Sequence, residues 1–156
     1  MDRDVFEKLK ERGHNRIPVY RTVLADLDTP LSVYLKLADG PDAYLLESVE
    51  GGETWGRFSI IGLPCSRRYV LNGNTVTAYE DGAEIGSEHV DDPLDFVSRL
   101  QRQFKAAEVD ELPVFTGGLV GYFGYEIVQN FEDRLKDADK HDQLETPEMV
   151  LLLSEE

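Results

Sequence analysis

The fold class is decided by the stretch RYVLNGNTVTAYEDG, residues 68–82. Two runs rich in β-branched and aromatic residues flank Asn72-Gly73, and this arrangement is a strong signal for a β-hairpin with a two-residue turn. Asp81-Gly82 is a second signal of the same kind, and strand-like segments precede the pair from Tyr44 onward. We therefore predict four to five antiparallel strands between residues 43 and 90.

Helical periodicity is found outside this region, in segments bounded by capping residues. The expected helices are residues 2–12, stopped by Gly13; a segment capped by Thr29, begun by Pro30 and ended by Asp39-Gly40; and a long helix capped by Asp92 and begun by Pro93, with Leu94, Val97, Leu100 and Phe104 along one face. A strand is also expected from Ile17 to Leu24. Many strands with a few helices predict an α+β class.

The apolar run Met149-Val150-Leu151-Leu152-Leu153 has the composition of a buried strand. Such a strand needs neighbours on both faces, as in the interior of a large sheet. We expect residues 1–156 to be a single domain, truncated where a larger architecture continues. A native terminal strand held in the sheet is the alternative.

Composition excludes several classes of protein. The chain has 156 residues, 16 Lys and Arg against 31 Asp and Glu, and a formal charge of −15, which disfavours binding to nucleic acid or to an acidic membrane surface. Its one cysteine, Cys65, cannot form an internal disulfide. Neither a secretory signal nor an apolar stretch long enough to span a membrane is visible. We expect a cytoplasmic protein.

No motif in the sequence predicts catalysis or metal binding. The acidic stretches at 80–98 and 132–156 lack the spacing of a calcium loop, and His14, His89 and His141 lie in separate polar segments. Gly118, Gly121 and Gly124 are not followed by the residues of a phosphate-binding loop. For these glycines we expect a packing role, because glycine permits close approach of backbones in a sheet.

The segment LLESVEGGETWGRFS, residues 45–59, is the best candidate for a binding site. It contains a carboxylate (Glu47), a hydroxyl (Ser48), an aromatic ring (Trp55) and a guanidinium (Arg57). These groups complement the ammonium, the carboxylate and the side chain of a free amino acid. Adjacent strand residues point to opposite faces, so an ordinary hairpin with an exposed Glu and an ion-paired Arg is the alternative.

Several motifs taken together resemble the N-terminal region of anthranilate synthase component I. They are Thr29-Pro30-Leu31-Ser32, Leu35-Lys36-Leu37, Leu45-Leu46-Glu47-Ser48, Gly56 to Gly62, and the glycine-rich stretch Gly117 to Glu126. The resemblance covers about residues 14–156, and only about the first third of such a subunit. The related aminodeoxychorismate synthase large subunit shares the glycine-rich motif.

The resemblance implies a fold and a function. The fold is the N-terminal part of a β/α/α/β sandwich of largely antiparallel strands with interleaved helices. The whole subunit is a lyase that converts chorismate and glutamine or ammonia to anthranilate and pyruvate, with Mg²⁺ and a glutamine amidotransferase subunit (component II). The metal ligands and catalytic residues belong to the C-terminal portion, so this chain alone is expected to have no catalytic residues and no turnover.

By the same resemblance, the N-terminal portion carries half of the tryptophan feedback site. The motif assigns this role to Ser48, Glu47 and Leu46, with Arg57 as a basic neighbour. Phe58 stands where the family often has Tyr, and its missing hydroxyl removes one hydrogen bond. Two other functions are kept open: the N-terminal portion of aminodeoxychorismate synthase component I, and a stand-alone amino-acid-binding module.

Overall fold

A computed structural model describes residues 1–47, 58–113, 115–130, 132, 134, 144 and 146–155. The chain divides into two compact units. The first contains Met1–Ala25 and Asp91–Thr116, and the second contains Asp26–Val90 and Gly117–Glu156. Three α-helices, one 3₁₀ helix and seven strands are found among the described residues. All of the strand pairs are antiparallel, which confirms the α+β class.

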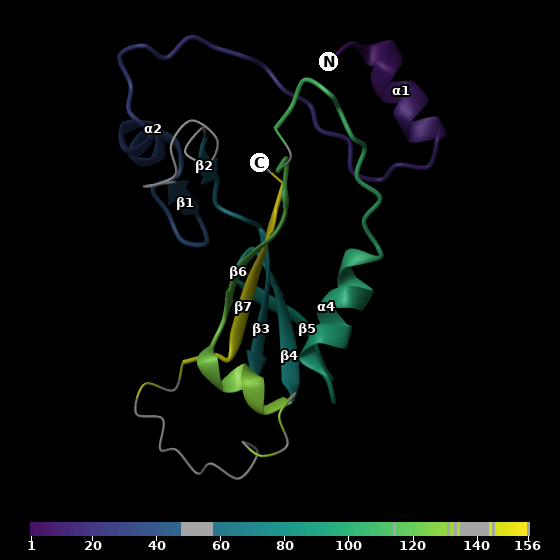
Figure 1. Cartoon of the computed structure of the whole chain (residues 1–156), viewed down its shortest axis with the longest axis vertical. Helices are drawn as coiled ribbons and strands as arrows, with labels where there is room; N and C mark the ends of the chain where they lie inside the picture. Colours follow the sequence, from purple (N-terminus) through teal and green to yellow (C-terminus); the bar gives the residue numbers. More distant parts are fainter. Residues whose placement is uncertain are drawn as a thin grey trace. The chain divides into compact units, whose positions relative to one another are not determined.

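The second unit is built on a five-stranded sheet (Figure 1). Its strand order is β5-β4-β3-β7-β6. The strands are β3 (Arg67–Asn72), β4 (Thr75–Glu80), β5 (Ala83–His89), β6 (Gly118–Phe123) and β7 (Met149–Ser154). Strand β7 therefore enters between β3 and β6 from the far end of the sequence.

Both predicted hairpins are present. Asp81-Gly82 joins β4 to β5 with φ angles of 50° and 81°, values that suit glycine and are tolerated by aspartate. The turn between β3 and β4 lies one residue later than predicted, because Asn72 pairs with Thr75 and leaves Gly73-Asn74 as the two turn residues. The φ angle of Gly73 is 56°.

Strand β7 confirms the prediction of an interior strand. Met149, Leu151 and Leu153 are 0%, 4% and 4% exposed, and the intervening Val150 and Leu152 are half-buried. One face of β7 therefore lies in the core, as do Leu71 of β3 and Val76 of β4. Alternation of burial along the strand is what a sheet with one fully covered face requires.

A two-stranded sheet and a short helix complete the second unit. Strand β1 (Tyr44–Glu47) pairs with β2 (Ser59–Gly62), and helix α2 (Pro30–Leu37) contacts β2. The 3₁₀ helix η1 (Tyr125–Asn130) comes after β6. With these strands, five lie between residues 43 and 90, as predicted.

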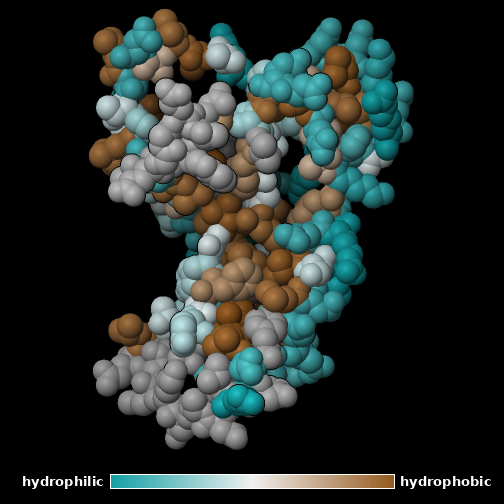
Figure 2. Space-filling model, in the orientation of Figure 1, coloured by the Kyte–Doolittle hydropathy of each residue, from teal (hydrophilic) through white to brown (hydrophobic). Residues whose placement is uncertain are grey.

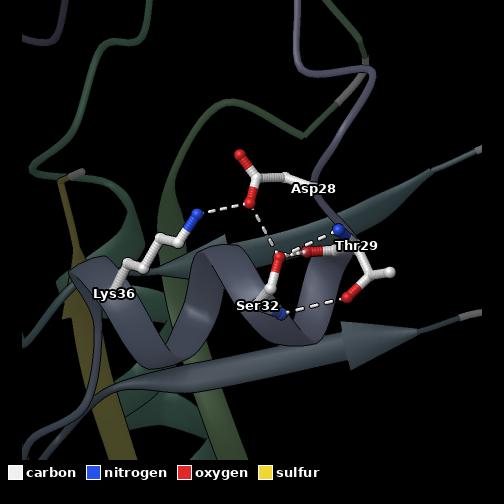
Figure 3. A network of polar contacts seen from close by, with 4 residues as sticks. All are labelled: Asp28, Thr29, Ser32 and Lys36. Carbon is white, nitrogen blue, oxygen red and sulfur yellow. Dashed lines mark hydrogen bonds and ion pairs between the residues drawn. The ribbon is translucent and has the colours of Figure 1, made fainter.

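Helix α2 begins at the predicted capping residues (Figure 3). The Ser32 N–H donates to Thr29 Oγ1 at 3.1 Å, and the Thr29 N–H donates to Ser32 Oγ at 2.9 Å. Lys36 and Ser32 donate to the Asp28 carboxylate. These hydrogen bonds, that of Lys36 first, lower the pKa of Asp28 below its usual value. The reciprocal pair is a capping box, which satisfies backbone groups that a helix start leaves unpaired.

The first unit contains α1 (Arg3–Glu11) and α4 (Pro93–Gln101). Helix α1 and its stop at Gly13, where φ is 85°, are as predicted. The strand expected at 17–24 is wrong. Within the first unit this region makes one isolated bridge, Arg16 to Ala106, and Val19, Val23 and Leu24 are 75%, 69% and 87% exposed. An apolar alternating segment becomes a strand only when a second strand pairs with it along its length.

Helix α4 begins at Asp92-Pro93 as predicted, and the Asp92 side chain accepts hydrogen bonds from Leu94 N and Asp95 N. Its expected length is wrong, because it ends at Gln101. The Asn15 side chain donates to Gln103 O and accepts from Lys105 N, both at 2.6 Å. These are backbone groups that a longer helix would pair internally, so the chain turns away before Phe104.

The buried face of α4 also differs from the prediction. Pro93, Phe96 and Leu100 are buried, whereas Leu94 is 42% exposed. Leu94, which belongs to the face that the sequence pattern indicated, is therefore not part of the buried face.

Large apolar side chains also reach the surface of the second unit. Leu31, Leu35 and Leu37 of α2 are 54%, 56% and 64% exposed, and brown residues are visible at the surface in Figure 2. None of the helices that the structure describes is both long enough and apolar enough to cross a membrane.

Candidate functional site

The candidate site lies on the β1–β2 hairpin. Glu47, the last residue of β1, pairs with Ser59, the first residue of β2, and Leu46 pairs with Ile60. The connection between the strands is the predicted segment 48–58, so the hairpin expected from the sequence is present. Ser48 and Arg57 were also assigned to the site, but both lie outside the described residues.

The two described site residues are accessible. Glu47 is exposed and Leu46 is 48% exposed. Because side chains alternate along a strand, Glu47 and Leu46 point to opposite faces of the hairpin. A ligand held by the Glu47 carboxylate would therefore meet Ser59 on the same face, since directly opposite residues on paired strands share a face.

Ser59 lies opposite Glu47 at the candidate site, and the sequence pattern did not single it out. Its hydroxyl faces the same side as Glu47 and is exposed. The signal that identifies it is the register of β1 against β2, which depends on the length of the connection. Together the two side chains offer a carboxylate acceptor for an ammonium group and a hydroxyl that both donates and accepts.

Two polar contacts hold the base of the hairpin against the five-stranded sheet. The Tyr44 hydroxyl lies 2.7 Å from Ser154 Oγ, at the end of β7. Just before β1, the Asp42 carboxylate accepts from Arg68 Nη1 of β3 at 3.0 and 3.2 Å. Glu47 therefore lies at the end of the hairpin next to the connection between the strands, and the base at the other end is fixed to the sheet.

Cys65 lies beside this base. Its N–H donates to Asp42 O at 3.1 Å. Burial raises the pKa of the Cys65 thiol, and the charges of Asp42 and Glu155 raise it further. A thiol with a raised pKa is a weak nucleophile at neutral pH, because the thiolate is the reactive form. The half-buried Cys65 is therefore not in the environment of a reactive cysteine.

A small pocket adjoins Cys65. It is lined by Leu63, Pro64, Cys65, Ser66, Leu153 and Glu155 and has a volume of about 190 Å³. Sites for small organic ligands usually have volumes of about 300 Å³ or more. The pocket is below that range, so we do not assign it to tryptophan.

The described residues do not fit a metal site. No group of three or more His, Cys, Asp or Glu side chains in the described part of the chain is placed to hold an ion. That Mg²⁺ is held elsewhere in a full-length subunit stays a prediction.

Gly121 has the packing role that was predicted for the glycine-rich stretch, whereas a Cβ on Gly118 would meet nothing within 4 Å. A Cβ on Gly121 of β6 would lie 1.9 Å from Val150 O of β7. Only glycine permits this approach of the two backbones. Gly121 therefore allows β6 to lie against the interior strand β7.

Comparison with known proteins gives a consistent result. The chain is 52% identical over 154 residues to a protein of Neisseria meningitidis serogroup B, 49% over 155 residues to one of Pseudomonas putida, and 48% over 155 residues to one of Pseudomonas aeruginosa. Each of these relatives is named anthranilate synthase component 1. The resemblance to this family is confirmed.

The match to anthranilate synthase component 1 covers 97% to 99% of this chain. It covers only 31% to 32% of the relatives, in their N-terminal part. The chain therefore spans about a third of the length of the relatives that it matches. No family model matches the chain.

Proposed function

We propose that the chain is the N-terminal portion of anthranilate synthase component 1 and acts in tryptophan biosynthesis. The observation that carries this proposal is the 52% identity over 97% of the chain. The whole enzyme would convert chorismate and glutamine or ammonia to anthranilate and pyruvate, with component 2 supplying the ammonia. The residues aligned here would contribute the scaffold and the regulatory site, and the rest of the subunit would contribute the Mg²⁺ ligands and the catalytic groups.

The regulatory site is proposed to bind tryptophan at the end of the β1–β2 hairpin that carries Glu47 and Ser59. Glu47 would accept from the ammonium group, Ser48 would contact the polar head, Leu46 would contribute apolar surface and Arg57 would be a basic neighbour of the carboxylate. Two observations support this: Glu47 is exposed at the last position of β1, and Ser59 lies opposite it. The remaining wall of the pocket would come from the catalytic portion.

A chimera tests both parts of the proposal. The chain is joined to the C-terminal two thirds of the Neisseria meningitidis relative, in place of that protein's own N-terminal third. Anthranilate formed from chorismate and ammonia with Mg²⁺ is followed by its fluorescence, with and without tryptophan. We expect an active enzyme that tryptophan inhibits. An inactive chimera, or an active one that tryptophan does not affect, would count against the proposal.

Matched variants then test the site. Ser48→Phe should fill the pocket and remove the inhibition, and Glu47→Gln should weaken tryptophan binding about 10-fold or more, because a charge-assisted hydrogen bond is lost. Glu84→Gln is the control, since Glu84 is an exposed glutamate of β5. Normal inhibition of the Ser48→Phe chimera would show that the assignment is wrong.

The chain by itself is expected to be inactive. Chorismate, ammonia and Mg²⁺ added to the purified 156-residue chain should give no anthranilate fluorescence. Fluorescence that rises with the concentration of this chain alone would contradict the proposed division of labour.

A further inference from the structure

Tyr44 connects two strands that are far apart in the sequence. Its hydroxyl is 2.7 Å from Ser154 Oγ, and the two residues are 110 positions apart. Tyr44 is the first residue of β1 and Ser154 is the last of β7, so this hydrogen bond joins the two sheets of the second unit. Ser154 is only 4% exposed, and a buried hydroxyl that loses its partner destabilises the fold.

Gly62 leaves room for the Tyr44 ring. It is buried and is the register partner of Tyr44. A Cβ at this position would lie 2.0 Å from Tyr44 Cε1 and 2.3 Å from Cζ. The ring therefore lies across the backbone of β2, and this packing fixes the direction in which the hydroxyl points.

A second contact holds the chain just before β1. The Arg68 guanidinium binds the Asp42 carboxylate and also lies 5.0 Å from the centroid of the Tyr79 ring. Asp42 is thus fixed to β3, so the residue two positions before β1 is held in place. A displacement of β1 itself would move Tyr44 and change its hydrogen bond to Ser154.

We propose that Tyr44 and Ser154 are positioning residues that couple the effector site on the β1–β2 hairpin to the end of β7. This inference rests on the proposed function. Glu47 lies three residues from Tyr44 on the same strand, a distance of about 10 Å at roughly 3.3 Å per residue. In the relatives the aligned third is N-terminal, so the residues C-terminal to the counterpart of β7 form the proposed catalytic portion.

The coupling would work through one short strand. Tryptophan bound beside Glu47 shifts the equilibrium of β1, Tyr44 carries the shift to Ser154, and the end of β7 changes its position relative to the catalytic portion. An effector can alter a distant site only through an element with two arrangements that both sites favour differently. The proposed element is β1, and the Tyr44–Ser154 hydrogen bond connects it to β7.

The contact itself is tested in this chain by amide hydrogen exchange. Tyr44→Phe and Ser154→Ala each remove one partner, and each should speed exchange in β1 and β2 about fivefold, the effect of losing a hydrogen bond of ordinary strength. The double variant should add little beyond either single one, and β4 and β5 should be unchanged. Tyr122→Phe is the matched control, because the Tyr122 hydroxyl donates to Pro147 O at 3.1 Å, at the opposite end of β7. Additive effects of the two substitutions, or none, would overturn the proposed contact.

The coupling is tested in the chimera. For Tyr44→Phe and Ser154→Ala we expect the factor by which saturating tryptophan suppresses anthranilate formation to fall at least fivefold, within the usual range of allosteric coupling. The uninhibited rate and the Kd of tryptophan should change less than twofold. Equal loss of binding, rate and inhibition would show a merely structural role, and unchanged inhibition would show no role. If tryptophan fails to bind the unsubstituted chimera, the proposed function fails, whereas the exchange experiment still decides the contact.

Discussion

Gly121 of β6 and Val150 of β7 approach so closely that a Cβ on Gly121 would lie 1.9 Å from the Val150 carbonyl oxygen. Backbone atoms in the interior of a five-stranded sheet cannot move aside as the end of a flexible side chain can. The two strands are paired along their whole length, from Gly118 with Ser154 to Phe123 with Met149. The absence of a side chain at residue 121 is therefore a condition for the β6–β7 pairing.

Gly121→Ala should destabilise the fold by roughly 3 kcal/mol, the upper end of the usual cost of steric overlap that forces backbone shifts. The measurement is the urea midpoint of unfolding at an unchanged m value. Gly40→Ala is the control, since its Cβ would meet Pro64 Cγ at an ordinary 3.4 Å. A change of less than about 1 kcal/mol is expected there. Equal midpoints for the two variants would contradict the close approach.

The elements between residues 43 and 90 could be predicted because their signals are local. Turn residues such as Asp81-Gly82 and alternating apolar residues specify a hairpin within a few positions. Residues 17–24 show the limit of this reasoning, because alternation indicates a possible strand without showing that a partner strand exists. The end of α4 depends on Asn15, which binds backbone groups 88 and 90 positions away. Nothing in the local sequence indicates that.

The candidate site also combines residues that a local motif identifies with residues that only the folded structure identifies. Glu47 and Leu46 were indicated by a motif, and the structure places both on β1. Ser59 became visible only with the register of the hairpin. Tyr44 and Ser154 are joined across 110 positions and two sheets, a contact that depends on the assembled fold.

The capping box of α2 gives a second stability prediction. Thr29→Ala removes the acceptor of the Ser32 N–H, and loss of such a cap usually has a cost of about 1 kcal/mol. Thr29→Ser keeps the hydroxyl and should restore nearly all of the stability. Urea unfolding of the three proteins measures the difference. If the serine variant is as unstable as the alanine variant, the hydroxyl is not the group that matters.

Cys65 gives a prediction on pH. Burial raises the pKa of its thiol, and Asp42 and Glu155 raise it further, so the folded chain holds this proton more tightly than the unfolded chain does. Its contribution to stability is therefore present below the pKa of the unfolded thiol, about 8.5. The contribution is lost as the pH rises through the higher pKa of the folded state. Between these two pKa values, the wild type should lose stability more steeply with rising pH than Cys65→Ser does.

Alkylation of Cys65 measures the same shift directly. Because the chain has one cysteine, the rate of carboxamidomethylation reports one thiolate. The pH at which this rate reaches half of its maximum should be higher in the native chain than in concentrated urea. Glu155→Gln should lower the native midpoint and leave the one in urea unchanged, and Glu84→Gln should alter neither. Coincident midpoints in the native and the unfolded chain would contradict the partly buried environment of Cys65.

Helix α4 offers a pair of variants that separates its buried face from its exposed one. Phe96 is 8% exposed and Leu94 is 42% exposed, although only Leu94 fits the face that the sequence pattern indicates. Truncating a buried Phe to Ala usually has a cost of about 3–5 kcal/mol, whereas a substitution at a partly exposed position usually has a cost of less than about 1 kcal/mol. Phe96→Ala should therefore be far less stable than Leu94→Ala in thermal unfolding followed by circular dichroism. Both substitutions leave alanine in the same helix, so differences in helix propensity do not explain a large gap. If Leu94→Ala is the less stable of the two, the helix is rotated toward the face that its sequence pattern indicates.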